Sequence, residues 1–271
     1  MSESKILVEV KNLHKSFGPL KVMDGLDFTL SKGENVAILG QSGTGKSVLL
    51  KVIIGLLDPD EGEVSLWGRP IAELAEKELN FLRRKMGMVF QSGALFDSMT
   101  VYENLAFPLV ESGETDEDKI AAVVRERLEW VNLPGSEEKF PSELSGGMRK
   151  RVALARTLAA DPELILYDEP TTGLDPLTSR KISSMIHDID KRVESTSIVV
   201  THDLDCAKKV ADRWCYLSGG RILADGTPEE LFNSKDREVR GFLEDITVKP
   251  IDSGEAKGSS GRIPSGKEDT R

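Results

Sequence analysis

One glycine-rich loop constrains this sequence more than any other feature. It lies between an apolar run at residues 35–39 and an apolar segment at residues 48–57, where a strand and then a helix are expected. Its residues are Gly40, Gln41, Ser42, Gly43, Thr44, Gly45, Lys46 and Ser47. At this spacing the glycines let backbone N–H groups turn toward phosphate oxygens, while Lys46 reaches the β- and γ-phosphates and Ser47 ligates Mg²⁺. This phosphate loop predicts an α/β protein that binds a nucleotide together with Mg²⁺.

Two carboxylates at the end of another buried strand supply the chemistry that such a loop needs. Residues 164–167 form an apolar run that ends at Asp168 and Glu169, and residues 197–200 form a further run. Helix-length segments separate these runs, as expected for a parallel sheet. Asp168 suits the Mg²⁺ shell, and Glu169 suits a general base that activates the attacking water. An acidic pair after a strand is often only the charge at the start of a helix. The interpretation as a metal ligand and a general base therefore depends on the presence of the phosphate loop.

The rest of the chain divides into segments of different character. Short antiparallel strands are expected at residues 6–10, 21–23 and 27–30, and helical periodicity runs from residue 91 to about residue 160. A capping box that begins at Thr115 and an N-cap at Ser145 would start two of the helices. Gly219 and Gly220 indicate a two-residue hairpin turn. The tail, residues 251–271, is rich in Gly, Ser and Pro, so we expect it to be disordered.

Composition excludes several classes of function. The chain has 271 residues, with 36 Lys and Arg against 46 Asp and Glu, which gives a formal net charge of −10. This acidic balance argues against nucleic acid as a partner. No apolar stretch approaches the ~20 residues of a membrane helix, and no signal peptide precedes the first expected strand. Cys206 and Cys215 are too few for a disulfide framework or a structural zinc site, so a cytosolic protein is expected.

A second anion-binding segment points to a family. It consists of Leu144, Ser145, Gly146, Gly147 and Met148, at the start of an expected helix. One chain needs only one phosphate cradle per nucleotide, so this segment is explained if it faces the γ-phosphate held by another copy. A helix cap with a flexible lead-in would account for the serine but not for both glycines. With these motifs, the chain from about residue 8 to residue 243 resembles the ATP-binding subunits of ABC transporters.

The resemblance implies a fold. It is a P-loop NTPase core of the RecA-like type with an antiparallel β subdomain at its N-terminus. An all-helical subdomain, at about residues 92–160, is inserted in this core, and the whole ATPase domain spans residues 1–250.

The resemblance also implies further site residues. Gln91 matches the glutamine that senses Mg²⁺ and the attacking water, so it joins Ser47 and Asp168 in the metal set. His202 matches the switch histidine that contacts the γ-phosphate, and Asp175 matches the aspartate that crosses the dimer interface.

Two residues beside the phosphate loop complete the ATP-binding set that the resemblance implies. Phe17 falls where the family stacks an aromatic ring, usually tyrosine, on adenine. Packing within the first sheet is the alternative for this residue. Val48 directly follows the phosphate loop.

Two stretches narrow the resemblance to the Mla/Mkl subgroup, whose permeases move phospholipids or other hydrophobic molecules between membranes. They are residues 91–109 and residues 140–151, where methionine follows the double glycine in place of the glutamine of many importers. In the family, the first stretch meets the membrane partner. Leu95, Phe96 and Met99 would then form an exposed apolar groove, unless they pack inside the helical subdomain.

The resemblance thus implies the ATP-hydrolysing subunit of a bacterial lipid transporter, peripheral on the cytoplasmic side of the inner membrane. Two copies would sandwich two ATP·Mg²⁺ and drive two permease subunits, together with a membrane-anchored lipid-binding protein and without nucleic acid. An ABC importer for a polar solute, such as an amino acid or an ion, is the first alternative. A soluble ABC ATPase that acts on ribosomes or DNA is the second, although such proteins usually carry two cassettes or long coiled-coil insertions.

Overall fold

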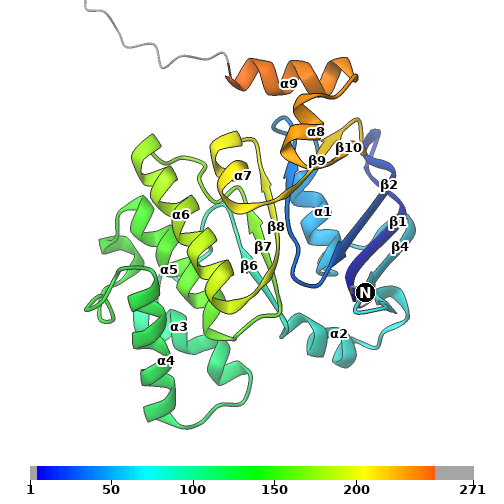
Figure 1. Cartoon of the computed structure of the whole chain (residues 1–271). Coiled ribbons are helices and arrows are strands. Elements are labelled where there is room, and N and C mark those ends of the chain that lie inside the picture. The colour runs from blue at the N-terminus through cyan, green and yellow to red at the C-terminus, as the bar shows by residue number, and fades with distance from the viewer. Residues whose placement is uncertain (1–4, 248–271) are drawn as a thin grey trace, which may run out of the picture.

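The computed structural model describes residues 5–247, and its centre is a large, mostly parallel sheet (Figure 1). In the described residues this sheet has six strands in the order β10-β9-β3-β8-β7-β6. Their bounds are β3 (Asn35–Leu39), β6 (Met86–Val89), β7 (Leu164–Asp168), β8 (Thr196–Thr201), β9 (Arg213–Ser218) and β10 (Arg221–Gly226). Neighbouring strands from β9 to β6 run parallel, and β10 pairs antiparallel with β9. The parallel sheet that the apolar runs predicted is therefore confirmed.

A smaller antiparallel sheet packs against the helix that follows the phosphate loop. Among the described residues its strand order is β2-β1-β4-β5. The elements are β1 (Ile6–Phe17), β2 (Leu20–Ser31), β4 (Glu61–Leu66), β5 (Arg69–Pro70) and the helix α1 (Lys46–Ile53). The expected strands at residues 6–10, 21–23 and 27–30 were too short, because register shifts between β1 and β2 break the alternation without ending the pairing. The expected helix at residues 48–57 in fact begins inside the phosphate loop and ends at Ile53.

Three helices lie between β6 and β7 in the chain. They are α3 (Val101–Glu111), α4 (Glu117–Trp130) and α5 (Gly146–Ala159). The expectation of helical periodicity throughout residues 91–160 was wrong for residues 91–100 and 131–145, which form loops, turns and a short 3₁₀ helix, η2 (Pro141–Glu143). The N-cap of α4 is Asp116, whose side chain accepts a hydrogen bond from the Lys119 amide, and not Thr115. Ser145 caps α5 as predicted.

The C-terminal third returns to the large sheet and covers it with helices. The helices are α6 (Pro176–Val193), α7 (Leu204–Val210), α8 (Pro228–Phe232) and α9 (Arg237–Thr247), and α2 (Glu76–Arg83) precedes β6. The predicted hairpin is confirmed, since β9 and β10 meet at Gly219 and Gly220. The Phe242 ring of α9 lies 4.9 Å from the Tyr216 ring of β9, which holds this helix against the sheet. The predicted disordered tail, residues 251–271, lies outside the described residues. None of the helices within residues 5–247 has both the length and the apolar composition that crossing a membrane requires.

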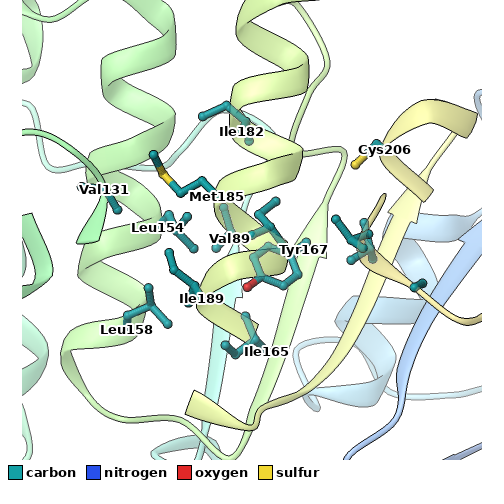
Figure 2. Packing of buried hydrophobic residues seen from close by; sticks show 14 of the residues in the cluster. Val89, Val131, Leu154, Leu158, Ile165, Tyr167, Ile182, Met185, Ile189 and Cys206 are labelled. Atoms are coloured by element: carbon teal, nitrogen blue, oxygen red, sulfur yellow. The ribbon is translucent and has the colours of Figure 1, made fainter. Parts of the chain in front are cut away.

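Alternate residues of the central strands enter two separate hydrophobic clusters. In β3, Ala37 and Leu39 pack with the helices α3 to α7, whereas Val36 and Ile38 pack with α1 and the small sheet. Figure 2 shows the first cluster, where Tyr167 of β7 lies close to α6 and its residue Ile189. Because both faces of the strands are buried, their sequences read as continuous apolar runs and not as alternating ones.

A buried carboxylate connects α6 to the strands of the large sheet. Asp190 accepts hydrogen bonds from the hydroxyls of Tyr167 (3.0 Å), Ser195 (2.8 Å) and Ser197 (3.1 Å). Burial raises the pKa of Asp190 to about 6, although the three hydroxyl groups oppose this shift. The charged form of Asp190 therefore destabilises the folded state relative to the neutral form.

The D190N variant is expected to be at least as stable as the wild type at neutral pH. The folded-state pKa of about 6 exceeds the ordinary value of 3.8, so the wild type loses stability as the pH rises through this window. The loss is at most about 3 kcal/mol. Because asparagine does not ionise, the advantage of D190N in free energy of unfolding should be largest above about pH 6 and shrink toward pH 4. Urea titrations at several pH values measure it, and a pH-independent difference would contradict the assignment.

Candidate active site

Two glycines let the phosphate loop pack tightly against its surroundings. A Cβ atom on Gly40 would lie 2.5 Å from the carbonyl oxygen of Leu217, and one on Gly45 would lie 2.5 Å from Cγ1 of Val22. Gly45 also has a φ angle of 99°, which disfavours any L side chain. The loop therefore holds a shape that no larger residue fits at either position, directly before α1 begins.

Lys46 lies inside the phosphate loop with its charge enclosed. Its Nζ donates hydrogen bonds to the carbonyl oxygens of Gly40 and Gln41, both at 2.9 Å, and lies 3.4 Å from Oε1 of Glu169. Burial lowers the pKa of Lys46, while the Glu169 carboxylate opposes that shift. The ammonium group is thus held in the loop between two carbonyl oxygens and the Glu169 carboxylate.

Ser47 and Asp168 form the contact expected of a magnesium site. The Ser47 hydroxyl donates a 2.6 Å hydrogen bond to Oδ1 of Asp168. Burial raises the pKa of Asp168, the Ser47 hydrogen bond lowers it, and the neighbouring charge of Glu169 raises it again. A hydroxyl and a carboxylate are hard oxygen donors, and Mg²⁺ is usually held by one or two such protein groups together with substrate phosphates. The two residues therefore fit Mg²⁺, which would also relieve the charge buried at Asp168.

Glu169 is held on three sides. Its Oε2 accepts a hydrogen bond from the Thr172 hydroxyl at 3.0 Å and lies 2.9 Å from Nδ1 of His202, while Oε1 faces Lys46. Its backbone has a φ angle of 49°, which is unusual for a residue with a side chain, and its amide donates to the carbonyl oxygen of Val200. Thr172 was not predicted; its position three residues after Glu169, in a turn, is the signal that could have found it.

Most of the predicted nucleotide residues, from five segments of the chain, line one pocket, whereas Gly40, Gln41, Thr44 and Asp168 do not line it. Its volume is about 380 Å³, within the range of small-molecule sites. Its lining residues are Phe17, Leu20, Val22, Ser42, Gly43, Gly45, Lys46, Ser47, Val48, Gln91, Glu169, Thr172 and His202. Phe17 is 47% exposed at the mouth, so its ring can meet a flat ligand and is not packed within the sheet. Leu20 and Val22 of β2 extend this apolar wall and were not predicted.

The glycine segment at residues 144–148 faces elsewhere. Ser145, Gly146 and Gly147 line a separate hollow of about 1060 Å³ together with Asp175 and residues of α6. Asp175 caps α6 by accepting hydrogen bonds from the amides of Leu177 and Thr178. Neither the segment nor Asp175 lines the pocket of this chain's own phosphate loop. The segment and Asp175 thus lie outside the pocket of their own chain's phosphate loop, and their role toward another copy stays a prediction.

The three residues of the predicted apolar groove lie on the loop at residues 91–100, which we call the docking loop, and they differ in exposure. Phe96 is 41% exposed, and its ring lies 4.9 Å from that of Phe107 on α3. Leu95 and Met99 are both half-buried, and Leu95 packs against the buried core. The fully buried Asn104 fixes the loop, because its side chain bonds to both backbone groups of Phe96 and to two further carbonyl oxygens. Asn104 was not predicted.

Comparisons with known proteins match these motifs. Residues 23–172 fit the family model described as "ABC transporter". The chain is 43% identical to the Mycobacterium leprae protein named probable ribonucleotide transport ATP-binding protein mkl, over 94% of this chain and 74% of that one. It is 42% identical to the intermembrane phospholipid transport system ATP-binding protein MlaF of Haemophilus influenzae, over 90% and 93% of the two chains. A solved post-hydrolysis dimer of the ATP-binding cassette MJ0796, bound to ADP and Pi, has a TM-score of 0.75 at 34% identity, over 82% of this chain and 98% of that one.

K46A is expected to bind nucleoside triphosphate at least about tenfold more weakly than the wild type, because a charge-assisted contact to phosphate is worth about 1.5–3 kcal/mol. Titration with a fluorescent triphosphate measures the dissociation constant. K51A is the matched control, since Lys51 lies on the same helix and does not line the pocket. Equal affinity of K46A and K51A would contradict the placement of Lys46 at the phosphates.

Proposed function

The chain belongs to the ABC transporter family as an ATP-hydrolysing subunit, and from this premise we propose that it drives the movement of phospholipids between two membranes. The observation that carries the ATPase role is the meeting of Lys46, Glu169 and His202 at one pocket. The cargo is supported by the intermembrane phospholipid transport proteins, which the chain matches along nearly their whole length.

The groups in and around this pocket have separate roles in the reaction. The phosphate loop and Lys46 bind the triphosphate of ATP, Phe17 stacks on the base, and Ser47 and Asp168 with Gln91 would hold Mg²⁺. Bound Mg²⁺ would neutralise charge on the phosphates. The Glu169 carboxylate accepts a proton from the attacking water, and the Thr172 hydroxyl and His202 fix its orientation. For this, Lys46 must leave Glu169 and turn to the phosphates as ATP enters.

A homodimer completes each nucleotide site. Ser145 and its two glycines lie outside the pocket of their own chain, so they meet a γ-phosphate only if a second copy brings one. Two copies would therefore enclose two ATP molecules, each between the phosphate loop of one chain and residues 144–148 of the other, with Asp175 at the shared interface. Loss of the γ-phosphate removes the contacts that hold the two chains together.

The docking loop provides the connection to the membrane. Exposed Phe96 and Phe107 form an apolar surface, while Gln91, at the start of the same loop, lines the nucleotide pocket. We expect each subunit of a permease pair to cover one such surface, with Met99 at its margin, and a membrane-anchored lipid-binding protein to deliver the cargo. This arrangement makes the chain a peripheral subunit on the cytoplasmic face of a bacterial inner membrane.

E169Q is expected to bind ATP but to hydrolyse it at least about 100-fold more slowly, since a general base contributes that much or more. Glutamine keeps the shape of the side chain and removes the proton acceptor, so the ATP-bound dimer should accumulate. Phosphate release and size-exclusion chromatography with ATP measure the two effects. E129Q, on an exposed position of α4, is the control and should match the wild type. Wild-type turnover by E169Q would remove Glu169 from this role.

F96D and L95D form a matched pair that tests the docking loop. Phe96 is exposed, so F96D should fold, bind ATP and lose co-purification with the permease. Leu95 packs on the core, so L95D should lower the free energy of unfolding by several kcal/mol. Thermal melts and affinity purification from cells measure the two results. An F96D chain that unfolds as L95D does would place Phe96 in the core and contradict docking.

The cargo has a separate test, because some relatives are named for ribonucleotide transport and not for phospholipid transport. Cells that lack the gene should accumulate misplaced phospholipid between their membranes and keep normal uptake of ribonucleotides and amino acids. Normal lipid distribution with loss of polar-solute uptake would assign the subunit to an importer.

A further inference from the structure

Lys150 connects the helix that carries Ser145 to the backbone of the catalytic carboxylate. It is the fifth residue of α5, and its half-buried side chain reaches across to β7, where Nζ donates a 3.3 Å hydrogen bond to the carbonyl oxygen of Glu169. Nothing in the mechanism above uses this contact.

Burial of the charged Lys150 side chain is unfavourable. Burial lowers its pKa, and the negative charges of Glu169 and Asp168 only partly oppose this shift. Among the described residues, no carboxylate lies within 4 Å of its Nζ, so the carbonyl oxygen of Glu169 is its direct partner. A half-buried ammonium group aimed at a carbonyl oxygen indicates a positioning contact and not an ordinary surface charge.

The hydrogen bond from Lys150 acts on the Glu169 peptide, which has an unusual backbone conformation. Its carbonyl oxygen also accepts a hydrogen bond from the Thr172 amide at 3.2 Å, and its φ angle is 49°. The two donors hold this peptide in a conformation that a residue with a side chain rarely adopts. A shift of Lys150 therefore changes the orientation of the Glu169 peptide and, with it, the direction of the carboxylate.

The neighbouring cations of α5 do not make this connection. Arg149 donates to the carbonyl oxygen of Leu144, and Arg151 donates to those of Val131 and Asn132, so both contacts stay within the helical region. Of these three consecutive cations, Lys150 is the one whose hydrogen bond, in the part of the chain that the structure describes, reaches the end of β7.

We propose that Lys150 couples the two nucleotide sites of the dimer. This inference rests on the proposed function, in which Ser145 contacts the nucleotide of the partner while Glu169 acts on the nucleotide of its own chain. One helix, α5, carries both Ser145 at its N-cap and Lys150 one turn later. When the partner's γ-phosphate fixes the start of α5, Lys150 fixes the Glu169 peptide, so hydrolysis at one site requires ATP at the other.

The test measures the rate of hydrolysis by the full chain as a function of ATP concentration. The wild type should show a Hill coefficient clearly above one. In K150M the coefficient should fall toward one and kcat should fall about fivefold or more, which is part of the at least about 100-fold that a well-placed general base contributes. Nucleotide affinity of the isolated chain should stay within about twofold, because Lys150 does not line the pocket. K150R keeps a donor and should restore most of the cooperativity, and R125M, which removes an exposed cation of α4, is the control and should behave as the wild type.

Other outcomes overturn the proposal. A wild type without cooperativity, a K150M that keeps the wild-type Hill coefficient, or an equal loss in R125M each removes the coupling role. If K150M does not fold, K150A serves in its place. Failure of both to yield soluble protein would make Lys150 a structural residue.

A mixing experiment separates failure of the coupling from failure of the dimer. The mixed dimer of one K46A chain and one S145R chain should trap nucleotide at about half the wild-type stoichiometry, because one of its two composite sites stays intact. No trapping would contradict the proposed dimer itself. Trapping without an effect of K150M would contradict only the coupling.

Discussion

The hydrogen bond from Ser47 to Asp168 joins the two halves of the nucleotide site across the large sheet. Ser47 follows β3 through the phosphate loop, Asp168 ends β7, and β8 lies between these two strands. All three strands are parallel, so their carboxyl ends reach the same edge. Glu169 and His202 directly follow two of those strand ends, and the phosphate loop brings Lys46 from the third to the same edge. Ligands of open α/β sheets bind at this edge. The apolar cores on either face keep the edge aligned.

Features that depend on neighbouring residues could be predicted from the sequence. Gly40 and Gly45 of the phosphate loop lie too close to Leu217 and Val22 for any side chain. The spacing of these glycines in the sequence therefore identifies the loop. The cap at Ser145 and the turn at Gly219 are likewise set within four residues. The lengths of β1 and β2 could not be read in this way, because bulges remove the alternation that marks a strand.

Features that depend on distant residues were missed or misplaced. Asn104 looks like any polar helix residue, and only the folded loop shows that its amide satisfies the backbone of Phe96. Leu95 and Phe96 are adjacent and both apolar, yet one packs on the core and the other is exposed, a difference that depends on the path of the loop. Thr172 was overlooked because its hydroxyl acquires a role only where Glu169 turns back at a positive φ angle.

The large sheet divides the hydrophobic core into two clusters with different neighbours. One face of the sheet packs on α1 and the small sheet beside the phosphate loop, and the other packs on the helices that hold the docking loop. Substitutions on well-separated sites without shared partners act nearly independently. The packing around residues 91–100 can therefore change in a lineage of such proteins while the packing behind the phosphate loop stays the same. This freedom does not extend to α5, which carries both Ser145 and Lys150.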